Sequence, residues 1–165
     1  MGATANQPPA GYVLDHTREA LGTGEQVFAA AKQALCAWRQ FQLPWLESTG
    51  GALQIGTVVG ILAHTAGWWW SNACRIVYVI DEQDSITRFG FAYGTLPDHV
   101  GSGEERFLIE WDHHDDRVWY DVLAFSRPQH LLARAGYPLV RRIQKRFGRE
   151  YSAAMRIAVG EPMAR

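Results

Sequence analysis

The sequence predicts an α+β domain in which a curved antiparallel sheet of about six strands wraps around a long C-terminal helix. Between residues 53 and 125, strand-like segments follow one another with only short polar turns between them. Such short connections indicate antiparallel neighbours, because parallel strands need long crossover segments. From Pro138 to Ala158, apolar side chains recur at every fourth position and give a helix one apolar face. The sheet must cover one of its faces, so we expect this helix to lie across the concave face.

The other elements precede or connect these two parts. We expect a first strand at residues 12–20 and then a helix at residues 25–38, whose apolar side chains have helical spacing. Pro44 interrupts the pattern and predicts a bend or a short second helix at residues 41–45. The later strands are expected over residues 53–63, 73–80, 86–95, 105–112 and 117–125. These elements form one domain over residues 11–160, preceded by a flexible N-terminus at residues 1–10.

The composition is typical of a soluble globular protein. The chain has 165 residues and a formal net charge of −1, which argues against a dedicated nucleic-acid binder. The C-terminal helix carries a row of basic side chains that could meet nucleic acid or anionic lipid, but the near-zero total charge favours a solvated helix face. Because the chain has neither an apolar run of membrane-spanning length nor a secretory signal, we expect a cytoplasmic protein without a membrane span.

The sequence gives no sign of a metal or a cofactor. Cys36 and Cys74 have no CxxC partner and no histidine at zinc spacing, so both are expected to be buried, reduced thiols. The run from His113 to Asp116 lies in a tight turn, where neighbouring side chains diverge and do not gather around an ion. Phosphate-binding loops, a full dinucleotide fingerprint and the serine-nucleophile elbow are all missing. We therefore expect no metal and no cofactor.

The stretch from Phe89 to Arg106 contains the strongest candidate for chemistry. Strand glycines lead into a loop with His99, and the loop ends on the acidic pair Glu104 and Glu105. A histidine beside carboxylates suits acid–base catalysis, because it titrates near neutral pH. The alternative is an architectural loop, in which Glu104 or Glu105 bonds loop amides or His99. In that case we also expect Gly94 to adopt a backbone that a side chain would hinder.

The string GTLP-x-H-x-x-x-GEE, from Gly94 to Glu105, resembles the DUF1990 family, which is also called UPF0548. Further segments fit the same family: Gly22-x-Gly24 followed by Phe28, the helix end at Leu35 to Trp38, Cys74-Arg75, and AFSRP at Ala124 to Pro128. The resemblance covers roughly residues 11–159. It implies a helix-grip fold similar to Bet v 1 and START-like proteins, which hold apolar ligands and include some cyclases. It implies no activity for the family itself.

We expect a small-molecule protein that holds an apolar or aromatic ligand between the sheet and the C-terminal helix. The expected wall residues are aromatic: Phe91, Tyr93, Trp111, Trp119, Tyr120 and Phe147. Arg75 sits in an apolar strand and either pairs with a structural carboxylate or fixes a polar group of the ligand.

Two alternatives remain open. In the first, the same cavity belongs to a cofactor-free cyclase or isomerase that uses His99 or an inward carboxylate, and Asp121 is one such candidate because it shares a strand face with Trp119 and Leu123. In the second, the core is filled and the domain is structural or partner-binding, with a possible homodimer contact through Trp68 to Trp70. A cavity of roughly 300 Å³ or more would favour ligand binding or catalysis.

Overall fold

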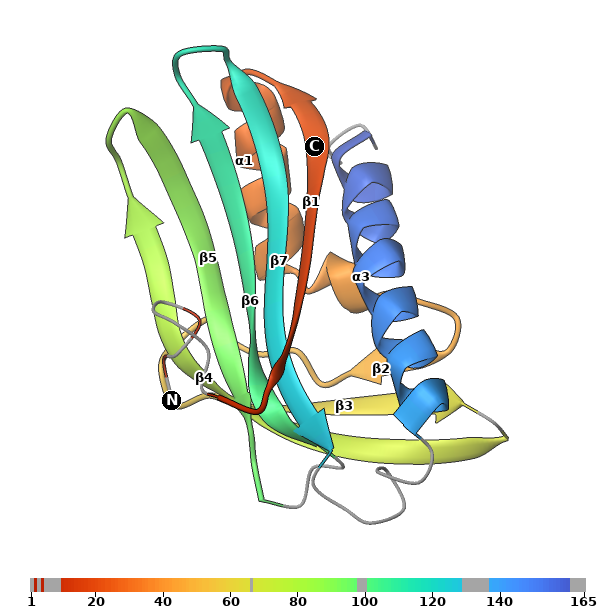
Figure 1. Ribbon diagram of the computed structural model, residues 1–165. Coiled ribbons are helices and arrows are strands. Elements are labelled where there is room, and N and C mark those ends of the chain that lie inside the picture. Colours follow the sequence, from red (N-terminus) through yellow and green to blue (C-terminus); the bar gives the residue numbers. More distant parts are fainter. Residues whose placement is uncertain are drawn as a thin grey trace.

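The computed structural model describes residues 2, 4, 10–65, 67–97, 101–128 and 137–160. Seven antiparallel strands form one curved sheet in the order β1-β7-β6-β5-β4-β3-β2, and the helices lie on its concave side (Figure 1). The strands are β1 (Val13–Thr23), β2 (Leu46–Ser48), β3 (Val58–Thr65), β4 (Trp68–Glu82), β5 (Ile86–Thr95), β6 (Gly101–Asp112) and β7 (Arg117–Pro128). The helices are α1 (Glu25–Cys36), the 3₁₀ helix η2 (Arg39–Phe41) and α3 (Tyr137–Gly160).

The predicted fold class is confirmed, and the differences lie in the strand count and boundaries. The additional strand, β2, has only three residues and falls between the predicted bend and the loop that follows it. It pairs with β3 through Leu46 and Ala63. A strand of three residues is too short to show the alternation of apolar and polar side chains by which strands are predicted. β4 begins at Trp68, five residues before the predicted start at residue 73, and therefore includes all three consecutive tryptophans.

Two strand glycines permit the close approach of neighbouring strands. A Cβ atom built on Gly90 would lie 2.2 Å from the carbonyl oxygen of Phe107, and one on Gly103 would lie 2.1 Å from that of Phe125. Both distances are far shorter than a real contact, so any side chain there would push β5 from β6 or β6 from β7. Gly94, where we expected a restricted backbone, pairs with Glu104 in the β5–β6 ladder.

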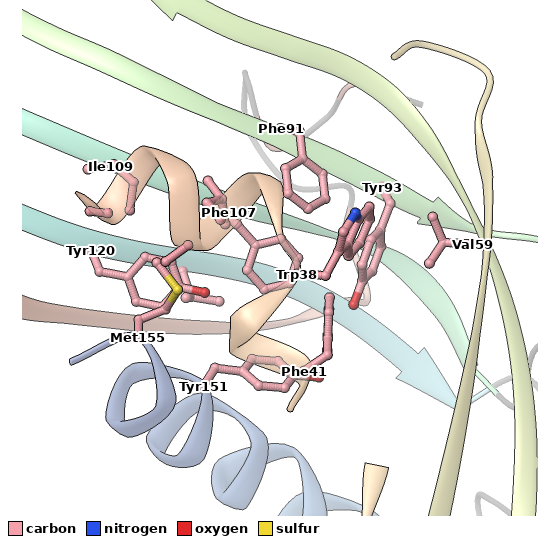
Figure 2. Close-up of a cluster of buried hydrophobic side chains, with 14 of the residues drawn as sticks. Trp38, Phe41, Val59, Phe91, Tyr93, Phe107, Ile109, Tyr120, Tyr151 and Met155 are labelled. Carbon is pink, nitrogen blue, oxygen red and sulfur yellow. The ribbon is translucent and has the colours of Figure 1, made fainter. Parts of the chain in front are cut away.

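Aromatic side chains fill a large part of the space between the sheet and α3 (Figure 2). The turn after α1 places Trp38 and Phe41 against the sheet, where the Phe41 ring lies 5.5 Å from Phe107 and 5.0 Å from Tyr151 of α3. Phe91 is fully buried beside them. At this level of the domain, therefore, the helix-grip interior is a packed core.

Polar contacts hold α3 across the first strand. Asp15 accepts two bonds from the guanidinium of Arg141, at 2.5 and 2.6 Å, and Glu19 pairs with Arg156 at 3.2 Å. Gly148 lies so close to Thr17 that a Cβ atom there would be 2.9 Å from the hydroxyl oxygen. The side of β1 that faces the helix is thus polar. Within the described part of the chain, no helix has the length and hydropathy needed to cross a membrane.

Candidate functional site

Glu105 lies on the concave face of β6, in the middle of the sheet. It pairs in register with Tyr93 of β5 on one side and with Ala124 of β7 on the other. The Tyr93 hydroxyl donates a hydrogen bond of 2.7 Å to the carboxylate. Burial raises the pKa of Glu105 from 4.5 to about 7, the bond from Tyr93 opposes this shift, and the charge of Asp15 adds to it. Both protonation states of this carboxyl are therefore populated near neutral pH.

Three phenols and a thiol share this interior with Glu105. Burial is the main cause that raises the pKa of Tyr93, Tyr120 and Tyr151 well above the usual value, and the charge of Glu105 raises each of them further. The same two causes raise the pKa of the Cys74 thiol to about 12. Each of these four groups is therefore a neutral hydrogen-bond donor at physiological pH. We call these five residues (Cys74, Tyr93, Glu105, Tyr120 and Tyr151) the Glu105 cluster.

One hydroxyl of the cluster lacks a partner. Tyr120 is fully buried, and its hydroxyl group forms no hydrogen bond with any of the described residues. Buried hydroxyls normally have a partner, because desolvation without one is costly. A group of a bound molecule could supply that partner.

Small and polar side chains lie toward the N-terminal end of α3. Ala124 is only partly buried, and across the ladder it faces Asp15, the partner of Arg141. Gln144 donates a bond of 2.7 Å to the Ser126 hydroxyl and accepts another of 2.7 Å from Arg141. This end of the interior therefore differs from the aromatic core beside it, and Glu105 lies between the two.

The neighbouring residue, Glu104, lies on the opposite face of the sheet. Its carboxylate accepts bonds from the backbone nitrogens of Gly2, at 2.5 Å, and Thr4, at 2.9 Å, and from the Thr4 hydroxyl, at 2.5 Å. Thr4 also bonds the Tyr78 hydroxyl at 2.5 Å and is buried, although we expected residues 1–10 to be flexible. Glu104 does bind backbone amides, but these two belong to residues 2 and 4 and not to the loop before it. Its role in the structure is to hold the N-terminal segment.

Two further candidates of the acid–base hypothesis lie elsewhere. His99, with its neighbour Asp98, falls outside the described residues. Asp121 is buried, but on the convex face of β7, where it accepts bonds from His16 at 2.7 Å and Arg106 at 2.8 Å. Burial raises the pKa of Asp121, yet these partners outweigh it and the net shift is downward. Asp121 is thus an ionised member of an outer-face charge network and not an inward carboxylate.

The seven expected ligand contacts, which are the six aromatic wall residues and Arg75, divide between the two faces. Five are on the concave side (Phe91, Tyr93, Trp111, Tyr120 and Phe147), and they pack into or against the core. The other two do not face the interior, which corrects our expectation. Trp119 lies on the convex face, with the Arg18 guanidinium 5.0 Å from its ring centre. Arg75 is exposed, because it alternates with the buried Cys74 and Ile76.

Sequence reasoning did not assign four residues to this site and misjudged one cysteine. Cys74 was expected only as a small buried residue, Tyr151 only as part of the apolar face of the C-terminal helix, and Arg141 only as part of a solvated basic row, while Asp15 was not considered. The alternation along β1 could have placed Asp15 on the helix side, but its partner lies 126 residues away. Cys36 is exposed, not buried, and both thiols are free. Among the described residues, no group of three or more potential ligands could hold a metal ion.

A groove of about 500 Å³ opens on the surface between η2, the loop that follows it and α3. Its lining includes Trp45, Arg146 and Glu150, and the Trp45 ring nitrogen donates a bond of 2.5 Å to the Glu150 carboxylate. None of the residues of the Glu105 cluster lines it. The groove is therefore distinct from the interior space for which we expected a ligand.

Solved structures of the same fold include a START superfamily protein from Mycobacterium smegmatis, with 13% identity and a TM-score of 0.55 over 90% of this chain and 97% of that one. A second is norcoclaurine synthase from Thalictrum flavum, in complex with dopamine and hydroxybenzaldehyde. It has 10% identity and a TM-score of 0.57 over 93% of this chain and 91% of that one. At such low identity the likeness shows the fold alone. The chain thus has a Bet v 1/START-like fold.

Sequence comparison is more specific. The chain is 38% identical over 159 residues to a UPF0548 protein of Dictyostelium discoideum, covering 90% of this chain and 74% of that protein. The family model described as "Domain of unknown function (DUF1990)" matches residues 1–154. This protein therefore belongs to the DUF1990, or UPF0548, family.

Proposed function

We propose that this protein binds a small apolar or aromatic molecule between the sheet and α3, with a polar group of the ligand directed at Glu105. The main support for this proposal is the Glu105 carboxyl. It combines a pKa of about 7 with residual accessible surface on the concave face of a central strand. Burial is the largest cause of the shift in pKa, and perturbed carboxyls of this kind are frequent at functional sites.

The surroundings of Glu105 restrict the ligand. The aromatic core excludes a large molecule, because Phe41, Phe91 and Phe107 have almost no accessible surface. Two polar groups near this core could bind a ligand: the Glu105 carboxylate can accept a hydrogen bond, and the Tyr120 hydroxyl has no hydrogen-bond partner among the described residues. A ligand with one ring or short apolar body and a donor–acceptor group, such as a hydroxyl, would satisfy both.

The fold supports this proposal by analogy. One protein of the same fold was solved with dopamine and hydroxybenzaldehyde, two small aromatic molecules that carry polar groups. Fold alone does not transfer an activity, so the chemistry must rest on the residues of this chain.

A second candidate function is acid–base catalysis on the same ligand, as in a cofactor-free cyclase or isomerase. It is favoured by the pKa of Glu105, because a carboxyl that titrates near pH 7 can both accept and return a proton under physiological conditions. Tyr93 would then position the carboxyl through its hydrogen bond.

The test is a binding screen with matched variants. Native mass spectrometry of protein purified from its source would identify a retained ligand, and titration of small phenols and aromatic amines would give affinities. Glu105→Gln should weaken binding by roughly tenfold or more, because it removes a charge-assisted hydrogen bond. Glu104→Gln is the matched control, since it changes the adjacent residue on the other face and should leave affinity unchanged. Equal affinities of wild-type and Glu105→Gln protein, or no binding of any of these compounds, would refute the proposal.

A further inference from the structure

The end of the β3–β4 hairpin exposes three consecutive tryptophans. The exposed fractions of Trp68, Trp69 and Trp70 are 71%, 55% and 45%. In Figure 1 this hairpin projects beyond the rest of the sheet, beneath the N-terminal end of α3. Exposed indoles in such a group indicate a contact surface, because water is a poor environment for so much aromatic area. We call the paired residues 63–65 and 68–70 the tryptophan hairpin.

The tryptophans cover both faces of the hairpin. Trp69 pairs in register with His64, and the two rings stack with centres 4.9 Å apart. Trp68 pairs with Thr65 and Trp70 with Ala63, so both lie on the opposite face from Trp69. A flat protein partner, including a second copy of this chain, would cover one face and leave the other in water. A medium that surrounds the tip would contact both faces.

The helix α3 also carries exposed basic side chains. Arg142, Lys145 and Arg149 of α3 are all exposed. Their spacing of three and four residues places them on one face of the helix, away from the buried Tyr151 and Met155. We call these three residues the basic stripe. In Figure 1, α3 and the tip of the tryptophan hairpin border the same side of the molecule.

Trp45 fixes the hairpin relative to this part of α3. Its carbonyl oxygen accepts a 2.8 Å bond from the backbone nitrogen of His64. Its ring packs on Phe147, with centres 4.6 Å apart, and the guanidinium of Arg146 lies 4.2 Å from its centre. Trp45 therefore contacts the hairpin through its backbone and the segment of α3 that carries the basic stripe through its ring.

We propose that the protein docks peripherally on an anionic phospholipid surface. In this arrangement the tryptophan hairpin enters the headgroup region and the basic stripe faces the lipid phosphates. Tryptophan is suited to this position, because its ring is apolar while its N–H remains in contact with polar groups. The basic stripe supplies the charge complementarity, since an anionic bilayer attracts lysine and arginine near its surface. The docking is independent of the ligand proposed for Glu105.

The test is co-sedimentation of the full chain with vesicles. One set contains phosphatidylcholine alone, and the other contains phosphatidylcholine and phosphatidylserine in equal parts. Wild-type protein should bind the mixed vesicles at least about tenfold more strongly, because the stripe contributes several favourable charges. Replacing Arg142, Lys145 and Arg149 together by alanine should abolish this preference. Arg117→Ala, at an exposed arginine of β7, is the control and should bind like wild type.

Single tryptophan variants separate a membrane from a second copy of the chain. Trp68→Ala and Trp69→Ala lie on opposite faces, and both should reduce vesicle binding several-fold, whereas Ile55→Ala, at an exposed apolar residue in the loop before β3, should not. All three positions are exposed, so circular dichroism should show unchanged folding. The proposal is overturned if wild-type protein does not prefer the mixed vesicles. It is also overturned if wild-type protein forms a dimer in sedimentation equilibrium that only one of the two tryptophan variants disrupts.

Discussion

Asp121 on the convex face of the sheet and Glu105 on the concave face are both carboxylates on central strands, yet their pKa values shift in opposite directions. Asp121 has cationic partners, with bonds from Arg106 at 2.8 Å and Arg18 at 3.3 Å in addition to His16. Within the described ranges, the donor to Glu105 is neutral: it is the Tyr93 hydroxyl. The contrast shows that burial alone does not decide the charge of a carboxylate, because the partners decide whether desolvation is offset.

The same contrast separates a structural carboxylate from a functional candidate. In the network on the convex face, Asp121 and Glu110 both bond arginines. Glu110 bonds Arg18 and accepts a 2.9 Å bond from Arg88. The carboxylates of this network are therefore paired with cationic side chains. Glu105 has no cationic partner among the described residues, so its ionised form lowers stability. Carboxyls of this kind are frequent at functional sites.

The largest effect on stability is expected from removal of the Asp121 charge, which has cationic partners. Asp121→Asn should lower the free energy of unfolding at neutral pH by about 2–4 kcal/mol, because it removes the carboxylate that Arg106 bonds and one of the two that Arg18 bonds. The folded-state pKa of Asp121 is lowered, so its contribution is present above the unfolded pKa and is lost as pH falls through the folded value. Urea denaturation of wild type and variant at neutral and acidic pH measures this difference in the free energy of unfolding. Asp115→Asn, in the exposed turn, is the control, and an equal loss in both variants would contradict the assignment.

Glu105→Gln should change stability in the opposite direction. The folded state holds its proton up to a pKa of about 7, whereas the reference value is 4.5, so wild-type protein loses stability as pH rises between these values. The variant carries no such charge and should be more stable than wild type by about 1–3 kcal/mol above neutral pH, with no gain at acidic pH. Thermal denaturation across this pH range measures the difference. A variant that is less stable than wild type at high pH would show that the surroundings of Glu105 stabilise its ionised carboxylate.

Tyr93→Phe should remove the hydrogen bond that the Glu105 carboxylate accepts from the Tyr93 hydroxyl. The hydroxyl lowers the pKa of the carboxyl, so its removal should raise that pKa further. The free energy of unfolding should fall by roughly 0.5–1.5 kcal/mol, and the decline in stability should begin at the same pH as in wild type but continue to a higher pH. Tyr78→Phe, whose hydroxyl bonds Thr4 on the other face, is the matched control. An identical pH profile for both variants would exclude the Tyr93 bond as a determinant of the pKa.

Sequence patterns predicted the architecture because the apolar repeat of α3 and the alternation of β5 and β6 are regular. Phe91, Tyr93 and Phe107 are all buried on the concave side. Alternation does not say which of two faces is concave when both carry apolar residues. In β7, Val118, Tyr120 and Val122 face inward, whereas Phe125 is equally buried on the convex side. This ambiguity is the physical reason for the wrong placement of Trp119 and Asp121.

The candidate site was only partly accessible to the same reasoning. Glu105 lies two residues from Phe107, so the pleat places both on one face, and the choice between Glu104 and Glu105 could have been made from β6 alone. The pKa of Glu105 could not be predicted from β6 alone, because it depends on Tyr93 of another strand and on Asp15 of β1. Arg75 lies close to a bulge in the β4–β5 ladder, between Ile76 and Tyr78, where strict alternation is interrupted.

The smallest effect is expected from His16, whose side chain is 51% exposed at the edge of the convex network. His16→Ala removes one of several partners of Asp121 and should cost only about 0.2–1 kcal/mol, because solvent screens the pair and both arginines remain. The bond from His16 is the first of the causes that lower the pKa of Asp121, so the variant should raise that pKa. An NMR titration of the Asp121 carboxyl would measure the shift, and the pKa of Glu105 in the same sample serves as the internal control. If both carboxyls shifted together, the two faces would be electrostatically coupled through the sheet, and the separation between structural and functional carboxylates would fail.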